Sequence, residues 1–267
     1  MTTELEHLPT TKYALALHTT TPELGLAVSN FADENRSQVW NLGRDLSSHI
    51  HQYLIDFIKQ RTWADLAFIA VAKGPGGFTG TRIGVVTART LGQQLNIPVF
   101  AVSTLAAVAW TEHISHISPD KKENLATFLR GSGGQTFAKE ENVAPLNKGS
   151  QSLAGVPPVV RTGVGWGDQI FAVEMAAQRG QIFGAIYQPA PDNSGLIALL
   201  PDTVFTPEAW QETLANWHTS YQLIKATSEL AATVSSILQL AYFDWQQGKR
   251  PNWSEALPYY GQHPVDL

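Results

Sequence analysis

The chain has 267 residues, of which 43% are hydrophobic and 15% are charged, so a substantial core can form and little surface charge remains. Its formal net charge of -5 argues against a broad cationic face for nucleic acid, which shows as clustered Lys and Arg. The absence of cysteine excludes disulfides, thiolate catalysis and zinc–thiolate sites. No apolar run is long enough to span a membrane, and Glu4 and Glu6 precede the first apolar stretch, unlike a signal peptide. We therefore expect a cytoplasmic protein.

The first part of the chain predicts three strands and a helix, and then strands that alternate with helices. Strands are expected at 13–19, 24–28 and 38–42 from short apolar runs and period-two alternation. A helix should follow Ser47 or Ser48, either of which can act as the N-cap, because apolar residues then recur on one helical face. These residues are Ile50, Tyr53, Leu54, Phe57 and Ile58.

The next segments continue the alternation. A continuous apolar run at 66–72 predicts a strand buried on both faces, and 81–95 predicts a helix that ends at Asn96 and Pro98. A strand at 97–102 and a helix at 104–112, capped by Ser103, complete this part. A three-strand meander followed by crossovers is the pattern of a ribonuclease-H-like lobe, which we assign to residues 1–117.

The second part of the chain is less regular. Residues 118–169 are rich in Gly, Ser, Pro, Asn and Lys, and we interpret them as a flexible insertion with one short element near 125–129. A hairpin is then predicted from 170 to 187, a helix from Pro207 to about 217 and a strand at 221–226. A last helix capped by Ser228 reaches about 246, and the tail reads as an extended arm packed on the body. Residues 170–267 form the expected smaller C-terminal lobe.

The most informative segment is a glycine-rich loop between the strand at 66–72 and the helix at 81–95. It consists of Gly74, Pro75, Gly76, Gly77, Phe78, Thr79 and Gly80. Backbone amides at such a place can hold an anion, and the alternative is a tight turn that only seats the next helix. The loop is not a Walker A motif, because no Gly-Lys-Ser/Thr follows, and its glycine spacing is not that of the dinucleotide fingerprint.

Three stretches resemble the TsaB family. Residues 74–85 are similar to its signature Gly-Pro-Gly-Ser-Phe-Thr-Gly-Leu-Arg-Ile-Gly, and 97–105 resemble its strand and Val-Ser-Ser-Leu helix start. Residues 178–183 resemble its Arg-Arg-Gly-Glu-Val-Tyr hairpin. The resemblance covers about 13–113 and 170–187 and is faint elsewhere, where 257–260 look like the family's C-terminal tail.

This resemblance implies an α/β fold of the actin-like (ASKHA) type, with two ribonuclease-H-like lobes and mixed sheets flanked by helices. It implies a subunit that pairs through its N-terminal lobe with the catalytic paralogue TsaD, or with a second copy of itself when alone. The family's complex recruits the ATPase TsaE, and TsaD transfers the threonylcarbamoyl group to adenosine 37 of tRNA. The chain would then be a non-catalytic partner that contacts tRNA only indirectly.

The end of the first predicted strand argues against catalysis by this chain. An actin-like phosphotransfer site needs a carboxylate there to organise a phosphate-bound metal, and relatives usually have Asp where this sequence has His18. We therefore expect no catalytic residue, no metal and no cofactor. Two alternatives stay open, an actin-like ATPase or kinase with its own nucleotide site and a free-standing carbamoyl transferase. Tight binding and turnover of Mg-ATP by the lone chain would favour the kinase.

Small residues on the helix at 81–95 suggest where a partner would bind. Gly84, Ala88 and Gly92 recur every four residues and predict a shallow groove, which could pack on the chain's own sheet or receive a partner helix. By resemblance, this helix and the helix at 48–58 lie at the dimer interface. The expected partner-binding residues are Ile50, Tyr53, Leu54, Phe57, Arg82, Gly84, Ala88 and Gly92. On this hypothesis Gly84→Leu or Gly92→Leu weakens pairing with TsaD while the monomer stays folded.

Overall fold

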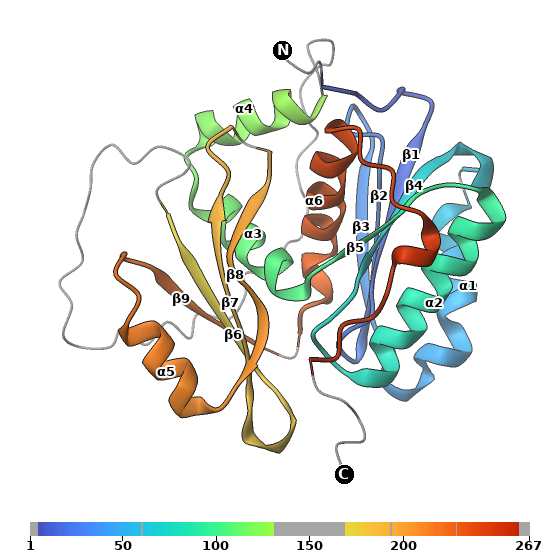
Figure 1. Ribbon diagram of the computed structural model, residues 1–267. Coiled ribbons are helices and arrows are strands. Elements are labelled where there is room, and N and C mark those ends of the chain that lie inside the picture. The colour runs from blue at the N-terminus through green and yellow to red at the C-terminus, as the bar shows by residue number, and fades with distance from the viewer. Residues whose placement is uncertain (1–4, 60, 131–168, 193, 228, 262–267) are drawn as a thin grey trace.

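The computed structural model describes residues 5–59, 61–130, 169–192, 194–227 and 229–261. Two mixed β-sheets, each covered by helices, form two lobes that lie side by side (Figure 1). Most of the expected insertion, 131–168, lies outside the described residues, whereas its first part forms the helix α4 (Pro119–Arg130).

The first lobe is built on a five-stranded sheet with the strand order β3-β2-β1-β4-β5. β1 pairs antiparallel with β2 and parallel with β4, as the predicted meander and crossovers require. Every residue of β1 is buried, because helices cover both faces of the sheet. The strands are β1 (Tyr13–His18), β2 (Glu23–Ser29), β3 (Asn35–Asn41), β4 (Leu66–Ala72) and β5 (Val99–Val102).

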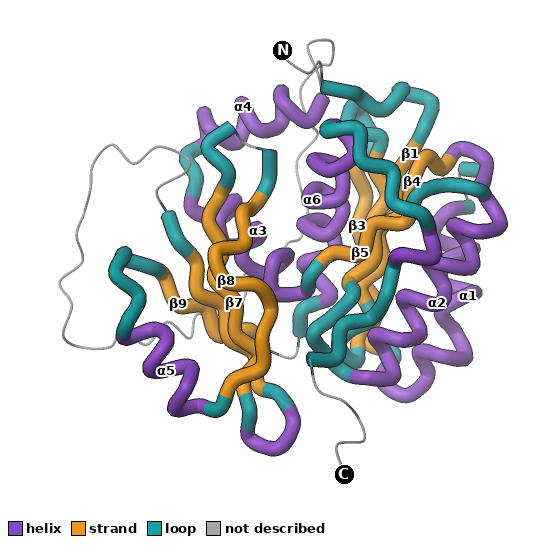
Figure 2. Tube along the Cα trace, in the orientation of Figure 1, coloured by secondary structure: helices purple, strands orange, loops and turns teal. Residues whose placement is uncertain are grey.

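Different helices cover the two faces of this sheet. On one face α1 (Leu46–Ile58) and α2 (Phe78–Leu95) pack against Leu15 and Leu17 of β1. On the other face α6 (Val234–Gln246) packs against Ala14 and Ala16. The alternation of large and small side chains along β1 therefore separates a face that receives two helices from a face that receives one (Figure 2).

The second lobe is built on a four-stranded sheet with the order β8-β7-β6-β9. α3 (Thr104–His116) packs on one face of this sheet and α5 (Pro207–Ala215) on the other. The predicted cap of α3 is confirmed, since the Ser103 hydroxyl accepts from the amide of Ala106. The strands are β6 (Phe171–Ala176), β7 (Ile182–Pro189), β8 (Leu196–Phe205) and β9 (Gln222–Ala226).

The two lobes exchange helices. α3 follows the first sheet in the chain but packs on the second sheet, and α6 follows the second sheet but packs on the first. α3 and α6 also contact each other between the two sheets (Figure 1). The predicted boundary between the lobes at residue 170 therefore does not separate the two packed units, because each unit includes a helix from the other side of that boundary.

Three details differ from the sequence-based predictions. α1 begins at Leu46 after Asp45, which makes no side-chain cap, so Ser47 and Ser48 lie inside the helix. α6 begins at Val234, six residues after the predicted cap Ser228, which lies outside the described residues. β8 was not predicted at all, because Pro201 interrupts its apolar run; an edge strand tolerates that proline.

Candidate partner-binding groove

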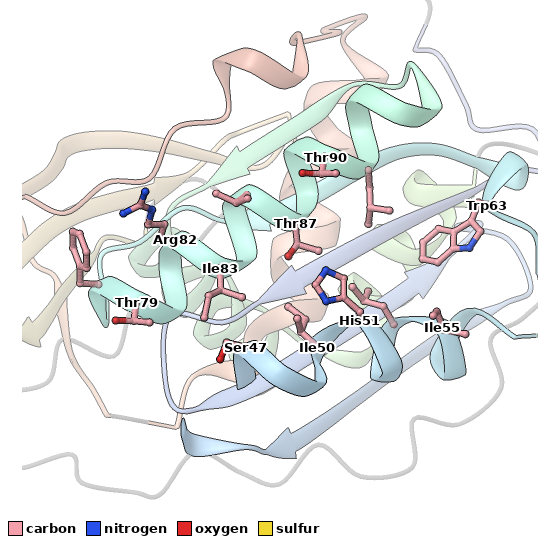
Figure 3. A pocket seen from close by; sticks show the side chains of 14 residues that line it. Ser47, Ile50, His51, Ile55, Trp63, Thr79, Arg82, Ile83, Thr87 and Thr90 are labelled. Atoms are coloured by element: carbon pink, nitrogen blue, oxygen red, sulfur yellow. The ribbon is translucent and has the colours of Figure 1, made fainter. Parts of the chain in front are cut away.

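A groove of about 710 Å³ runs between α1 and α2 on the outer surface of the first lobe (Figure 3). Its lining comes mainly from these two helices, and most of the side chains are apolar. Leu54 and Ile50 of α1 form part of its buried base, whereas Ile55 of α1 and Val86 of α2 stand at the surface. The groove is therefore open to a ligand or partner and apolar in character.

Exposed apolar side chains concentrate at this groove. Eight large hydrophobic residues are exposed in the described part of the chain, and three of them, Ile55, Phe78 and Val86, line the groove. Ile55 and Val86 are 51% and 52% exposed, values far from those of core residues. Contiguous exposed apolar surface marks sites of association more often than isolated residues do. The groove is thus the strongest candidate for a protein-binding surface among the described residues.

The polar groups of the groove are cationic or neutral. Arg82 of α2 and His51 of α1 both line it, together with the hydroxyls of Ser47, Thr79 and Thr90 (Figure 3). None of the described residues that line it carries a carboxylate. A partner that places an acidic side chain near Arg82 would gain a charge-assisted hydrogen bond there.

The structure brings together only some of the predicted partner-binding residues. Ile50, Leu54 and Arg82 line the groove, and their binding of a partner stays a prediction. Tyr53 and Phe57 instead pack toward β3, where both rings contact Trp40, at centroid distances of 4.9 Å and 6.0 Å. These two aromatic residues therefore hold α1 against the sheet.

The predicted seam of small residues faces the inside of the lobe. Gly84, Ala88 and Gly92 are all buried. A Cβ atom on Gly84 would lie 2.1 Å from Thr19 Oγ1, and one on Gly92 would lie 2.3 Å from Val99 Cγ2. These residues allow α2 to approach its own sheet, so the expectation that they form a groove for a partner is wrong. The groove lies along the neighbouring face of α2, which carries Arg82 and Val86.

Sequence reasoning missed several groove residues, namely His51, Ile55, Val86 and Thr90. The sequence could have revealed them through apolar residues that lie outside the main hydrophobic face of each helix. Ile55 and Val86 carry that signal, since an amphipathic helix normally places polar residues there.

The glycine-rich loop packs closely against the turn between β1 and β2. The amide of Gly77 donates to the carbonyl of Thr20 at 2.7 Å. A Cβ atom on Gly76 would lie 2.4 Å from that same carbonyl oxygen, and one on Gly80 would lie 2.1 Å from the carbonyl oxygen of Thr19. Gly74 adopts a φ of +103°, which favours glycine, and the Gly74–Pro75 peptide is cis. Of the two interpretations of this loop, its contacts support the tight turn that seats α2.

A second hollow of about 1210 Å³ lies between the two lobes. The glycine-rich loop and Thr19–Thr21 line it from the first lobe, and Gln178 and Arg179 line it from the second. None of the described residues that line it carries a carboxylate. The donors that a phosphate-bound Mg²⁺ prefers are carboxylate oxygens, so this residue set does not fit such an ion.

His18 ends β1, the place where we expected an actin-like phosphotransfer site to carry its acid. The ring is fully buried, and neither nitrogen has a hydrogen-bond partner among the described residues. Burial lowers the pKa of His18 to about 3, so the imidazole is neutral near pH 7. A buried neutral imidazole cannot replace a carboxylate at a hard-metal site. The described residues also contain no group of three or more His, Asp or Glu side chains placed to hold a metal ion.

No helix among the described residues combines the length and the hydrophobicity needed to cross a bilayer.

Comparisons with known proteins match different parts of the chain. The family model of TsaD, the tRNA N6-adenosine threonylcarbamoyltransferase, matches residues 44–140, which include both helices of the groove. The chain is 58% identical over 45 residues to the tRNA threonylcarbamoyladenosine biosynthesis protein TsaB of Bacillus subtilis, which is 17% of this chain and 20% of that one. It is 35% identical over 79 residues to the TsaB protein of Buchnera aphidicola from Schizaphis graminum, 28% of this chain and 34% of that one. The chain thus matches about a fifth to a third of the length of these relatives.

Solved structures extend the likeness to the whole fold. YeaZ from Pseudomonas aeruginosa superposes with a TM-score of 0.60 and 18% identity, over 93% of this chain and 99% of that one. An uncharacterised protein from the same organism, described as similar to peptidase YeaZ, superposes with a TM-score of 0.62 and 18% identity, over 94% of this chain and 100% of that one. This likeness confirms the predicted two-lobe fold of mixed sheets flanked by helices. The sequence matches to TsaB proteins and the shared YeaZ fold agree: the chain is similar to TsaB proteins over part of its sequence and has the YeaZ fold over nearly all of its length.

Proposed function

We propose that the chain is a non-catalytic partner subunit that supports a TsaD-type threonylcarbamoyltransferase in forming N6-threonylcarbamoyladenosine at position 37 of tRNA. The observation that carries this proposal is the open apolar groove between α1 and α2, within the segment that matches the TsaD family model. Its partner would be a TsaD-type protein, whose interface residues would fill the groove. The names of the relatives, biosynthesis proteins of this modified nucleoside, support the same pathway.

The physical basis of such an association is burial of the exposed apolar side chains. Ile55, Phe78 and Val86 are each more than a third exposed in the lone chain. Fully burying a side chain of this kind contributes about 1.5–3 kcal/mol relative to leaving it exposed, so three of them can form the centre of an interface. Arg82 at the same surface would select a partner that presents a carboxylate.

The other partners belong to this proposal as well. A second copy of the chain would occupy the groove when TsaD is absent, and a TsaE-type ATPase would join the complex of the two subunits. We place tRNA in contact with the catalytic subunit, since the net charge of -5 gives this chain no overall attraction for nucleic acid. The complex would act in the cytoplasm.

An ATPase or kinase is less well supported. The described residues around the hollow between the lobes offer no carboxylate for Mg²⁺, and His18 is buried and neutral. A free-standing transferase would need a base or metal at the same place. Neither alternative has an observation of its own in its favour.

Restoration of tRNA modification tests the proposal. The chain is expressed together with the TsaD-type protein of its own genome in a bacterial strain depleted of its TsaB, and the modified nucleoside is measured by mass spectrometry of digested tRNA. The wild-type chain should restore the nucleoside. Ile55→Asp should restore little of it, because a carboxylate would have to be desolvated in the apolar interface.

The matched control is Ile197→Asp, at an isoleucine that is 45% exposed on β8, far from the groove in the sequence and on the other lobe. This variant should restore modification as the wild type does. The proposal fails if Ile55→Asp and Ile197→Asp restore modification equally, provided that circular dichroism shows both variants to be folded.

A further inference from the structure

The segment that follows α6 crosses from one lobe to the other (Figure 1). We call residues 251–261 the strap. In the first lobe the carbonyl of Pro251 accepts from the amide of Val99 at 3.4 Å, and Ala256 is buried in the core that α1 and α2 share. The amide of Tyr259 donates to the carbonyl of Lys73 at 2.6 Å. The strap is thus anchored to the first lobe at Val99 of β5, in the core beneath α1 and α2, and at Lys73, which follows β4.

The end of the strap is anchored in the second lobe. The hydroxyl of Tyr259 donates to the backbone carbonyl of Asp202 in β8 at 2.7 Å. A Cβ atom on Gly261 would lie 2.6 Å from Phe183 Cε1 and 2.7 Å from Val204 Cγ2, so the strap lies directly on the second sheet. Tyr259 therefore bonds to both lobes, through its backbone to one and through its side chain to the other.

Tyr260 links the strap to both hollows of the molecule. It lines the hollow between the lobes, and its ring lies against Phe78 with a centroid distance of 4.4 Å. Phe78 begins α2 and lines both the hollow between the lobes and the groove between α1 and α2. One side chain thus belongs to the two sites, and the strap fixes its position.

We propose that the strap sets the separation of the two lobes and that the contact between Tyr260 and Phe78 couples this separation to the partner-binding groove. A partner that packs on Phe78 favours the ring position that Tyr260 supports, and hence the closed arrangement of the lobes. By linkage, closure of the lobes then strengthens binding at the groove by the same factor. The coupling rests on the proposed function of the groove, whereas the control of the lobes by the strap does not.

The first experiment measures the separation of the lobes in the lone chain. Because the sequence has no cysteine, Ser37→Cys on β3 and Gln211→Cys on α5 introduce two unique and exposed sites for spin labels, one on each lobe. Double electron–electron resonance should give one narrow distance distribution for the doubly labelled chain. In the same background Tyr260→Ala should broaden it, because the ring that bridges strap and α2 is lost.

The strap also provides a matched control and a milder variant. Leu257 lies in the same segment but is 59% exposed, so Leu257→Ala should leave the distribution unchanged. Tyr259→Phe removes only the hydroxyl that bonds to Asp202, and it should broaden the distribution even if Tyr260→Ala does not fold. Distributions for Tyr260→Ala and Tyr259→Phe that superpose on that of the control would overturn the role of the strap.

The second experiment measures binding of the TsaD-type protein from the same genome by calorimetry. Tyr260→Ala should weaken binding about fivefold to tenfold, within the range of measured couplings, although Tyr260 does not line the groove. If Tyr260→Ala broadens the distribution of distances between the lobes but leaves the affinity for the TsaD-type protein unchanged, the coupling is overturned. The role of the strap in setting the separation of the lobes would then still hold. If Ile55→Asp in the groove also leaves the affinity unchanged, the proposed function of the groove fails, and the resonance result still decides the role of the strap.

Discussion

At the scale of single residues, His18 is a titratable side chain enclosed in the core of the first lobe. It ends β1, is fully buried and has no hydrogen-bond partner among the described residues. Leaving a buried polar group unsatisfied costs about 1–3 kcal/mol. His18 therefore lowers the stability of the folded chain, with no compensating hydrogen bond in the described structure.

The buried state of His18 predicts a dependence of stability on pH. In the folded chain the pKa is lowered from its ordinary value of 6.5 to about 3, so between these values the unfolded chain binds more protons than the folded chain. The free energy of unfolding is therefore highest above pH 6.5 and falls as the pH falls toward 3. The loss from this residue should be about 2 kcal/mol at pH 5. Urea denaturation at pH 7.5 and at pH 5 measures it.

Substitution separates His18 from other titrating groups. His18→Leu should raise the free energy of unfolding at pH 7.5 by about 1 kcal/mol, because an unsatisfied polar group is replaced by an apolar one, and should reduce the loss at pH 5. Burial also lowers the pKa of His113, to about 4. His113 therefore titrates in the same direction, and part of the dependence of the unfolding free energy on pH should remain in the variant. The exposed His49 is the control, and His49→Leu should keep the full slope. An unchanged slope in His18→Leu would contradict this account of the residue.

At the scale of elements, one face of α2 packs on the first sheet and a neighbouring face lines the groove. The spacing of Gly84, Ala88 and Gly92 correctly predicted a close approach of α2 to another element. Periodicity shows which residues share a face and does not show what covers that face, so the partner of this seam could not be predicted. The structure shows that the partner is the first sheet, through Thr19 and Val99.

This packing predicts a loss of stability from the smallest substitution in the seam. Gly84→Ala should lower the free energy of unfolding by about 1–3 kcal/mol, although alanine favours a helix by roughly 1 kcal/mol, because its Cβ would overlap Thr19. Gln94→Ala, at an exposed position of the same helix, should change it by less than about 0.5 kcal/mol. Thermal and urea unfolding of the two variants provide the measurement. A stabilised Gly84→Ala protein would show that the seam has room.

Much of the fold followed from the sequence, for identifiable reasons. β1, β2, β4 and the helix α2 carry strong period-two or continuous apolar patterns with clear ends at Gly, Asn or Pro, and the structure has them close to the predicted residues. β8 escaped prediction because its ladder to β7 is irregular around Ile186 and its own run contains Pro201. The groove escaped in part because it is formed by two helices whose relative position depends on the sheet beneath them.

At the scale of the whole molecule, the exchange of helices joins the lobes into one cooperative unit. α3 extends the core of the second lobe and α6 that of the first, so neither sheet keeps both of its covering layers if the other lobe unfolds. We therefore predict one transition in differential scanning calorimetry, with equal calorimetric and van't Hoff enthalpies.

Core substitutions in the two lobes test this cooperativity. Tyr242→Ala removes a ring of α6 that stacks on Phe31, and Trp210→Ala removes a ring of α5 whose indole donates to Glu174. Each should destabilise the protein by about 3–5 kcal/mol and lower the temperature of the same single transition. Two separate transitions, each moved by only one of the variants, would show that the lobes unfold independently.

The central claim is that the groove between α1 and α2 binds a TsaD-type protein, and calorimetric titration with that protein tests it most directly. Val86→Asp, at a valine of the groove that is 52% exposed, should weaken binding at least tenfold, or about 1.4 kcal/mol, without unfolding the chain. Val39→Asp, at a valine of β3 that is 39% exposed outside the groove, should bind as the wild type does. Equal affinities for these two variants would contradict the account.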